Sequence, residues 1–245
     1  DQIHVLHTVN TLGMGGAEQY VIRLSRALAD MGIRVTVAAA SATSPLRKSL
    51  GSDVEYLDLP LIPTDGVLLR HFGNGVRVPH VLSRYIENES VHLVHTYLVA
   101  SGLWAWVAAH RAGVPVVHTQ MHVYENAGPY ERLVFRIGEL KSLVSVFHGL
   151  SDYLSGQLRS EFGVPDDRVR TITSGIDTTL FAPADQSSAR RIAGIPQGRF
   201  VVGLCSRLRP EKRLDLAIRA HAVLMDTVPD ALLVIAGGGS EASNL

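Results

Sequence analysis

Five short segments carry the residue types that could do chemistry, and each follows a run of apolar residues. The first is the glycine-rich run G-M-G-G-A-E, which contains Gly15, Gly16 and Glu18. Glycines before a helix let the backbone come close to an anion, and the helix N-terminus supplies free N–H groups. A tight turn would need glycine for geometry alone, so the run predicts either an anion site or a structural turn. It is a poor dinucleotide fingerprint, because Glu18 stands where the third glycine of G-x-G-x-x-G would be.

Two further segments place histidines directly after predicted strands. His95 and Tyr97 follow one strand, and His118, Gln120 and His122 follow the next. Each could bring an imidazole to a ligand, since ligands of open α/β sheets bind beyond the carboxyl ends of the strands. Polar residues at the rim of the sheet are the alternative. No metal site is expected, because the histidines lack the H-E-x-x-H pattern and fall in a predicted loop.

The last two segments follow the C-terminal strands. Residues 206–213, S-R-L-R-P-E-K-R, include Arg207 and Lys212 at a strand-to-helix junction. Arginine offers a rigid fork and lysine a point charge, so this junction could hold a diphosphate. The alternative is a solvated charged run, although basic residues are not what a helix N-terminus prefers. Gly237 and Gly239 belong to G-G-G-S, which predicts either a nucleotide cradle or a plain turn.

The composition is that of a folded protein with balanced charge. Of the 245 residues, 46% are hydrophobic and 19% are charged, which is ample material for a core. Lys+Arg and Asp+Glu both total 23, so no basic excess favours nucleic acid as a partner. The single cysteine, Cys205, excludes a disulfide framework and a cysteine-based zinc site, and it favours a cytoplasmic location. The charge-free run Val91–His110 has the length of a membrane span but is predicted to divide into a strand and a helix.

Strands and helices alternate along the chain, which predicts an α/β fold with a parallel sheet. The predicted strands are Ile3–Val9, Ile33–Ala39, Val54–Leu57, Val91–His95, Pro115–His118, Val144–Phe147, Val169–Ile172, Phe200–Leu204 and Ala231–Ala236. Helices are predicted between most of them. The stretch 174–199 is rich in Ser, Pro, Gly and Ala and is a predicted linker. It separates a Rossmann-like domain over 1–173 from a unit over 200–245 that is too small to be a complete domain.

Taken in order, the segments resemble the retaining glycosyltransferases of family 4, which have the GT-B fold of two Rossmann-like domains. I-H-V-L-H-T-V-N-T-L-G-M-G-G-A-E resembles the family's first strand and G-G-x-E loop, and V-H-L-V-H and V-P-V-V-H-T resemble its two strands that end in histidine. S-G-I-D-T-T-L-F-A-P resembles the segment near the domain junction. G-L-C-S-R-L-R-P-E-K-R-L-D-L-A-I-R-A and P-D-A-L-L-V-I-A-G-G-G resemble the start of the donor domain.

The resemblance implies roles for individual residues. Gly15 and Gly16 would lie near the donor phosphates and the transferred sugar. His118 would be the catalytic residue that contacts the sugar at the reaction centre. Arg207 and Lys212 would bind the donor diphosphate and stabilise the nucleoside diphosphate as it leaves. Further nucleotide- or sugar-binding positions would be Glu18, Gly237 and Gly239, and the acceptor side would include His95, Tyr97, Gln120 and His122.

The resemblance also implies a reaction. It would be the metal-independent transfer of a hexosyl-type sugar, with retention, from a nucleotide-diphosphate sugar and without a further cofactor. The acceptor would be a polysaccharide, glycolipid or small molecule, as in the biosynthesis of lipopolysaccharide and other cell-surface glycans. In this family a helix such as Tyr130–Lys141, with Arg132 and Arg136, can touch the inner face of a membrane that carries the acceptor. A packed helix with solvated arginines is the alternative.

Departures from the family pattern fall at Ser174, Ser206 and Arg213, where the family has Asn, Gly and Gly. The family's E-x-x-x-x-x-x-x-E segment, which holds the donor sugar and ribose, is expected beyond Leu245. The residues 1–245 alone are therefore expected to transfer no sugar. Two other functions are compatible with the same residues: a GT-B-like sugar-nucleotide epimerase, which needs no acceptor, and a non-catalytic sugar- or nucleotide-binding module.

Overall fold

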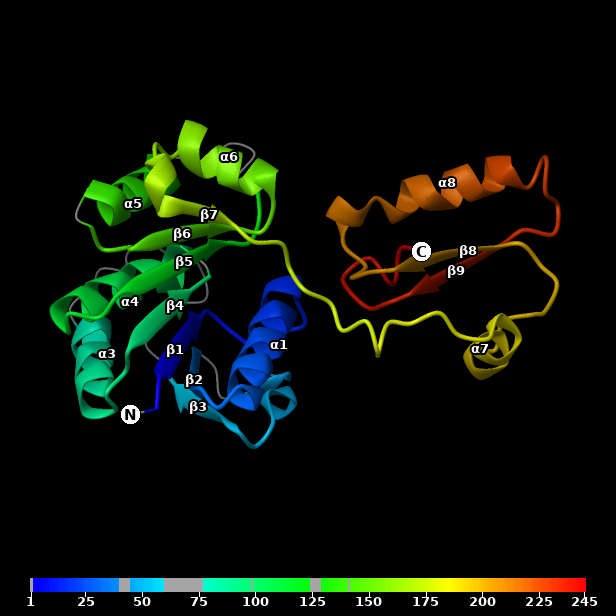
Figure 1. Ribbon diagram of the computed structural model, residues 1–245. Coiled ribbons are helices and arrows are strands. Elements are labelled where there is room, and N and C mark those ends of the chain that lie inside the picture. The colour runs from blue at the N-terminus through cyan, green and yellow to red at the C-terminus, as the bar shows by residue number, and fades with distance from the viewer. Residues whose placement is uncertain (1, 40–44, 60–76, 98, 124–128, 141) are drawn as a thin grey trace. The chain divides into compact units, whose positions relative to one another are not determined.

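The computed structural model describes residues 2–39, 45–59, 77–97, 99–123, 129–140 and 142–245. It contains two compact units, residues 1–175 and residues 176–245 (Figure 1). The first is built on a seven-stranded parallel sheet and the second on a two-stranded parallel sheet. The predicted α/β fold with parallel strands is confirmed. The stretch 174–199, predicted as a linker, contains a helix, Gln186–Ala193 (α7).

The seven strands of the first unit lie in the order β3-β2-β1-β4-β5-β6-β7. The strand order reverses between β1 and β4. The C-terminal ends of these two strands therefore lie next to each other at the carboxyl edge of the sheet. The strands are β1 (His4–Val9), β2 (Arg34–Ala39), β3 (Val54–Asp58), β4 (Leu93–Thr96), β5 (Val116–Gln120), β6 (Val146–Gly149) and β7 (Val169–Thr171).

Helices cover both faces of this sheet, and the apolar side chains explain which helix covers which face. The helices are α1 (Gly16–Asp30), α3 (Arg77–Asn88), α4 (Val99–Arg111), α5 (Pro129–Leu140) and α6 (Asp152–Ser160), with short 3-10 turns at Arg47–Leu50 and Asp166–Arg168. Leu6, Val94 and Phe147 form one core with α3, α4, α5 and α6. Val9 and Val35 form a second core with α1 on the other face. Successive strand residues point to opposite faces, so β1 and β2 contribute side chains to both cores.

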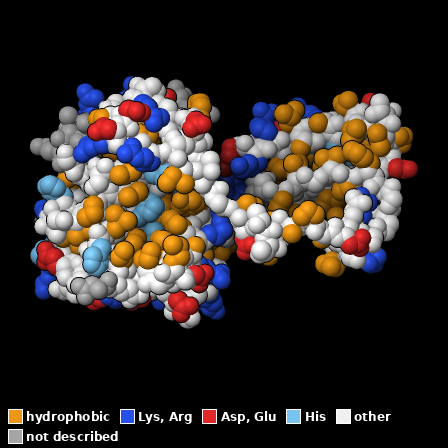
Figure 2. All heavy atoms as spheres, in the orientation of Figure 1, with side chains coloured by type: hydrophobic (Ala, Val, Ile, Leu, Met, Phe, Trp, Pro, Cys, Tyr) orange, Lys and Arg blue, Asp and Glu red, His pale blue; other side chains and the backbone are white. Residues whose placement is uncertain are grey.

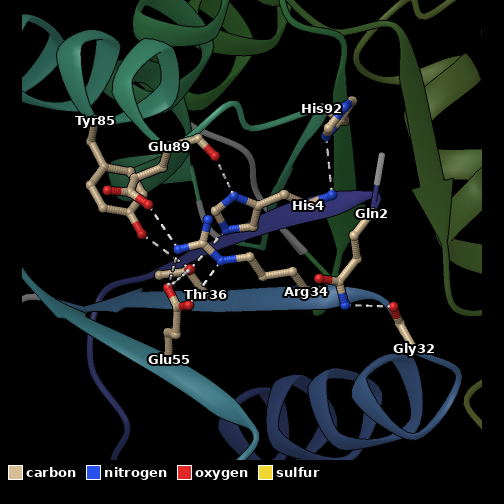
Figure 3. A network of polar contacts seen from close by, with 9 residues as sticks. All are labelled: Gln2, His4, Gly32, Arg34, Thr36, Glu55, Tyr85, Glu89 and His92. Atoms are coloured by element: carbon tan, nitrogen blue, oxygen red, sulfur yellow. Dashed lines mark hydrogen bonds and ion pairs between the residues drawn. The ribbon is translucent and has the colours of Figure 1, made fainter.

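A polar clasp ties the end of α3 to the amino ends of β1, β2 and β3 (Figure 3). Arg34 lies at its centre. Its Nε lies 2.8 Å from Oε1 of Glu55, and its Nη2 lies 2.8 Å from Oε2 of Glu89. The hydrogen bond from Arg34 lowers the pKa of the Glu55 carboxyl group. One guanidinium group therefore joins a strand and a helix that are far apart in the sequence.

Thr36 supplies the buried part of the same clasp (Figure 3). Its hydroxyl donates to Oε2 of Glu55 at 3.0 Å and accepts from the hydroxyl of Tyr85 at 3.1 Å. Nε2 of His4 lies 2.9 Å from Oγ1 of Thr36, and Nδ1 of His4 lies 2.9 Å from the carbonyl oxygen of Glu89. The clasp lies at the amino ends of the strands, where it stabilises the sheet and is remote from the ligand edge.

The second unit contains α7, β8 (Val201–Cys205), a 3-10 turn at Pro210–Lys212, α8 (Leu214–Leu224) and β9 (Leu232–Ala236). Its buried apolar side chains are Leu208, Leu214 and Ala231. Strand residues that would be buried in a full sheet are half exposed, and Figure 2 shows apolar side chains over these strands. The unit thus has a small core that centres on the loop after β8.

The charge-free run Val91–His110 divides into β4 and α4, as predicted from the sequence. Within the described ranges, no helix combines the length and the apolarity that crossing a bilayer requires.

Candidate functional site

The glycine loop after β1 leads directly into α1, with Gly15 as the residue before the helix. Gly15 has φ −119° and ψ 166°, an extended conformation that any residue adopts. A Cβ built at Gly16 would meet no atom within 4 Å, and one at Gly15 would meet the flexible carboxylate end of Glu18. The fold therefore does not require glycine at either position. Since no side chain caps α1, its first N–H groups are available to an anion.

Glu18 lies in the first turn of α1, with its carboxylate folded over Gly15. A carboxylate at this place is favoured by the partial positive charge of the helix N-terminus. A ligand phosphate at Gly15 would have to displace the Glu18 side chain.

His118 lies inside the core rather than at the ligand edge. The predicted strand ended at His118, but β5 continues for two residues to Gln120. The His118 side chain is 1% exposed, and its ring packs edge-on against Trp106, with the ring centroids 5.1 Å apart. Nδ1 of His118 lies 2.8 Å from Oγ1 of Thr96. Burial lowers the pKa of His118 to about 3, so its imidazole is neutral at physiological pH.

A continuous chain of hydrogen-bonding side chains crosses the opposite face of the sheet below the ligand edge. The Tyr97 hydroxyl lies 2.5 Å from Nδ1 of His7 and 3.1 Å from Nδ1 of His95. Nε2 of His95 lies 2.7 Å from Oγ1 of Thr119, which lies 2.9 Å from Nδ1 of His148. We call these five residues the histidine relay: four lie in strands β1, β4, β5 and β6, and Tyr97 directly follows β4. It fixes the carboxyl ends of four strands to one another.

Burial keeps two members of the histidine relay uncharged. Burial lowers the pKa of His7 to about 3, and burial together with the charge of neighbouring histidines lowers the pKa of His95 well below its usual value. Burial likewise raises the pKa of Tyr97. His95 and Tyr97, predicted for the acceptor side, are thus internal residues that hold the strand ends in place. Figure 2 shows histidine and apolar side chains together over β4 and β5.

His122 is the predicted histidine that reaches the outside of the sheet edge. It lies two residues beyond the end of β5 and is exposed. Gln120, which is buried, donates from Nε2 to the carbonyl oxygen of His122 at 2.9 Å. This hydrogen bond fixes the backbone of the loop. Partial burial lowers the pKa of His122.

Arg207 and Lys212 lie in the second unit, in the loop between β8 and α8. Both side chains are exposed, and neither forms an ion pair within the stretch 142–245, which is described without a gap. Arg213, in contrast, is paired with Asp215 at 3.2 Å. Figure 2 shows Lys and Arg side chains gathered near the start of α8. Unpaired cations at the N-terminus of a helix are a suitable environment for a diphosphate.

Gly237 and Gly239 differ from Gly15 and Gly16, because the fold requires glycine at both positions. Their φ angles are 155° and 156°, which L side chains rarely adopt. A Cβ at Gly237 would overlap the carbonyl oxygen of Ser206, and one at Gly239 would overlap that of Leu208. The backbone geometry therefore requires glycine at both positions, and the nucleotide-binding role stays a prediction.

The structure brings the predicted residues together in two groups. The first unit places Gly15, Gly16 and Glu18 after β1 and His122 after β5. The second unit places Arg207 in the loop that pairs with the glycine turn and Lys212 in the 3-10 turn before α8. In the described ranges, no cluster of three or more His, Cys, Asp or Glu side chains is suited to a metal ion. Sequence reasoning missed His7, Thr119 and His148; the available signal was the histidines His7, His95 and His148 in β1, β4 and β6.

The helix predicted to touch a membrane is α5. It buries Val134 and Phe135 in the core, while Leu133 is 58% exposed. Arg132 and Arg136 are exposed, and Lys141 lies outside the described residues. The burial of two apolar residues supports the alternative of a packed helix with solvated arginines.

Comparison with known families identifies the chain. Residues 14–180 match the family described as Glycosyltransferase Family 4, and residues 185–245 match the family described as Glycosyl transferases group 1. The first match covers more than half of the chain, so the chain belongs to this glycosyltransferase family. The resemblance inferred from the sequence motifs is confirmed.

A curated relative and two solved structures show the extent of the similarity. The chain is 29% identical to D-inositol 3-phosphate glycosyltransferase 2 of Catenulispora acidiphila, in an alignment that covers 98% of the chain and 60% of that protein. HepE of Anabaena, solved in complex with UDP and glucose, matches with a TM-score of 0.75 and 20% identity over 99% of the chain and 63% of HepE. UDP-N-acetylglucosamine 2-epimerase from Rickettsia bellii matches with a TM-score of 0.62 and 13% identity, over 100% of the chain and 64% of that enzyme.

These likenesses confirm the expected GT-B-type fold. At identities of 20% and 13% they show the fold alone, since one fold hosts many functions. The chain spans about 60% of the length of the curated relatives that it matches.

Proposed function

We propose that the full-length protein is a retaining glycosyltransferase that moves a hexosyl-type sugar from a nucleotide-diphosphate sugar to an acceptor. One observation carries the proposal: the fold does not require glycine at positions 15 and 16. Glycines at these positions leave the N-terminus of α1 open to an anion. Membership of a glycosyltransferase family supports the reaction class. The presence of UDP and glucose in HepE supports a uridine nucleotide sugar as the first donor to try.

In this proposal, Arg207 and Lys212 hold the donor diphosphate. As the sugar is transferred, negative charge develops on the leaving nucleoside diphosphate, and fixed cations stabilise that charge. The proposal is supported by the exposure of both side chains and by the absence of ion-pair partners in the stretch 142–245. The diphosphate charge would be met by these side chains, so the proposed reaction needs no metal ion.

We also propose that the imidazole that contacts the transferred sugar is that of His122. His118, which the family resemblance implied, is enclosed by Trp106, Phe135 and Phe147. His122 instead follows the carboxyl end of β5 and is exposed, with its backbone held by Gln120. The role of His118 stays a prediction, which the paired variants in the Discussion test against that of His122.

For the acceptor, the relatives and the sequence point to two classes. Several curated relatives are named D-inositol 3-phosphate glycosyltransferase, so an inositol phosphate is the first acceptor to try. Polysaccharides and glycolipids of the cell surface are the second class. The protein would act in the cytoplasm, and contact with the inner face of the membrane through α5 would accompany a lipid-linked acceptor.

An epimerase is the second candidate function, because the fold is shared with UDP-N-acetylglucosamine 2-epimerase at a TM-score of 0.62. An epimerase would change the sugar nucleotide without any acceptor, whereas the proposed transferase would not. Analysis of the products formed without an acceptor separates the two.

The experiment uses the full-length protein with the substitution Gly16→Ala. Alanine is a better helix former than glycine by up to about 1 kcal/mol, so the variant should melt no lower than the wild type. Its transfer of glucose from UDP-glucose to D-inositol 3-phosphate should nevertheless fall at least about tenfold, because the methyl group occupies the space of the donor. If another nucleotide-diphosphate sugar or a glycan acceptor proves better in a screen, the pair with the highest turnover is used.

The matched control is Gly156→Ala in α6, where a Cβ would also meet no atom within 4 Å. This variant should gain similar stability and keep wild-type transfer. Wild-type transfer by Gly16→Ala, or absence of transfer by the wild type with every donor and acceptor in the screen, would contradict the proposal.

A further inference from the structure

The end of β9 and the turn of three glycines after it are hydrogen-bonded to the loop after β8 at alternate residues. The N–H of Ser206 donates to the carbonyl of Ala236 at 3.1 Å, and the N–H of Leu208 donates to the carbonyl of Gly238 at 2.9 Å. The N–H of Glu241 donates back to the carbonyl of Leu208 at 3.0 Å. The parallel pairing of β8 with β9 thus continues beyond both strands.

This pairing determines which side chain of the loop faces outward. Leu208 is 6% exposed and is one of the few buried side chains of the second unit. Arg207 precedes it and is exposed. Ser206 is hydrogen-bonded to the last residue of β9, and Leu208 is hydrogen-bonded to the glycine turn. The backbone that carries the guanidinium group of Arg207 is therefore held on both sides.

Two of the three glycines make this close approach possible. At Gly237 a Cβ would overlap the carbonyl oxygen of Ser206, and at Gly239 it would lie 2.9 Å from the backbone N of Leu208 and overlap the carbonyl oxygen. These are backbone atoms, so a clash could be relieved only by moving the whole loop. At Gly238 a Cβ would meet no atom within 4 Å.

We propose that Gly237 and Gly239 are positioning residues for the donor diphosphate. They do not contact the nucleotide; they let the loop 206–208 lie against the turn and thereby place Arg207. The proposal rests on the role given to Arg207 under the proposed function. A displacement of about 1 Å in a group that stabilises charge can cost a large factor in rate. Because Arg207 is proposed to contact the diphosphate, moving it should weaken binding of the diphosphate and not of the nucleoside.

The test measures nucleotide binding to the full-length protein by isothermal titration calorimetry. The probe is UDP or GDP, whichever the wild type binds more tightly, together with the matching nucleoside. The variants Gly237→Ala and Gly239→Ala should weaken diphosphate binding at least about tenfold and leave nucleoside binding within about twofold, since only the cation moves. Gly238→Ala, the matched control in the same turn, should leave both affinities within about twofold.

A double-mutant cycle with Arg207→Ala separates positioning from general damage. If the glycines act through Arg207, Gly239→Ala should cost no further diphosphate affinity in the Arg207→Ala background. A loss as large as that in the wild-type background would overturn the proposal, as would unchanged diphosphate binding in Gly239→Ala or equal damage from Gly238→Ala.

Two further outcomes are distinguished from failure of the positioning role. If Arg207→Ala alone binds the diphosphate like the wild type, the proposed role of Arg207 fails, whatever the glycines do. If the two alanine variants do not fold, Leu208→Ala loosens the same loop without adding a Cβ to the turn. It should also lower diphosphate affinity more than nucleoside affinity, and an equal fall in both would overturn the positioning role.

Discussion

The hydroxyl oxygen of Tyr97 lies 2.5 Å from Nδ1 of His7, and both side chains are fully enclosed. The far end of the histidine relay sets the direction of this hydrogen bond. There, Nε2 of His148 lies 2.8 Å from the carbonyl oxygen of Ile172, which can only accept. A neutral His148 therefore carries its proton on Nε2 and accepts at Nδ1 from Thr119.

The direction of the remaining hydrogen bonds follows from this tautomer of His148. The Thr119 oxygen accepts from Nε2 of His95, so Nδ1 of His95 accepts from the Tyr97 hydroxyl. The Tyr97 oxygen then accepts from Nδ1 of His7. Every donor points the same way, and each histidine has one defined tautomer: Nδ1–H in His7, and Nε2–H in His95 and His148.

We predict that Tyr97→Phe destabilises the chain by about 2–4 kcal/mol, because it leaves one buried donor on His7 and one buried acceptor on His95. Urea unfolding of the wild type and the variant measures the difference. Tyr153→Phe is the control, since Tyr153 is 68% exposed, and it should change stability by less than about 0.5 kcal/mol. Equal stability of Tyr97→Phe and the wild type, or ¹⁵N spectra that place the His95 proton on Nδ1, would contradict the assigned direction.

The buried histidines predict that the chain loses stability in acid. Burial lowers the pKa of His7 and of His118 to about 3 in the folded chain and also lowers that of His95, whereas an exposed histidine has a pKa of about 6.5. Below pH 6.5 the unfolded chain binds protons that the folded chain does not, so stability is complete above this pH and falls as the pH decreases toward 3.

The expected slope is about 1.4 kcal/mol per pH unit for each of the three histidines, once the pH is well below 6.5. Urea unfolding at a series of pH values from 7.5 to 4.5 measures it. A free energy of unfolding that does not decrease between pH 7 and pH 5 would mean that these histidines are not held neutral in the folded chain.

Thr36 should contribute more to stability than the exposed ion pairs beside it. Thr36→Val keeps the shape of the side chain but removes the hydroxyl that contacts His4, Glu55 and Tyr85, so we predict a loss of about 2–3 kcal/mol. Glu55→Gln, at a half-exposed pair, should cost about 1 kcal/mol or less. The control Thr36→Ser retains the hydroxyl. The prediction fails if Thr36→Val costs no more than Glu55→Gln in the same thermal unfolding experiment.

Two variants separate the histidines that follow or belong to β5. His122→Ala should lower sugar transfer by the full-length protein at least about tenfold with little change in melting temperature, since His122 is exposed. His118→Phe keeps an aromatic ring against Trp106 and loses the hydrogen bond to Thr96, so it should cost about 1–2 kcal/mol of stability. The His118→Phe variant should transfer sugar at the wild-type rate per folded molecule. The reverse pattern would return the sugar contact to His118.

The alternation of strands and helices could be predicted because it depends on local periodicity. The apolar stripe of α1 and the β-branched runs of β1 and β2 are visible in the sequence, and the predicted strands overlap the observed ones. What the sequence could not supply was the environment of polar residues. The predicted strand ended at His118, yet β5 also includes the polar residues Thr119 and Gln120, because their backbones pair with His148 and Gly149 of β6.

The glycines also show that the sequence does not give the environment of a residue. Gly15, Gly16, Gly237 and Gly239 look alike in the sequence, and only the structure separates those that the fold requires from those that it does not. Arg213 is the converse case: it has φ 48°, a left-handed conformation, at a position where the family pattern has glycine. Such differences depend on atoms contributed by segments that are distant in the sequence.

The proposed transfer reaction is tested most directly by measuring where the donor sugar goes. The full-length protein is incubated with UDP-glucose, or with the best donor of a nucleotide-sugar screen, in the presence and absence of D-inositol 3-phosphate or a glycan acceptor. The account predicts that the sugar appears on the acceptor with its anomeric configuration retained, together with one nucleoside diphosphate per sugar, and that the donor sugar is not isomerised without an acceptor. An isomerised sugar nucleotide, an inverted linkage, or a donor that is bound but never consumed would contradict it.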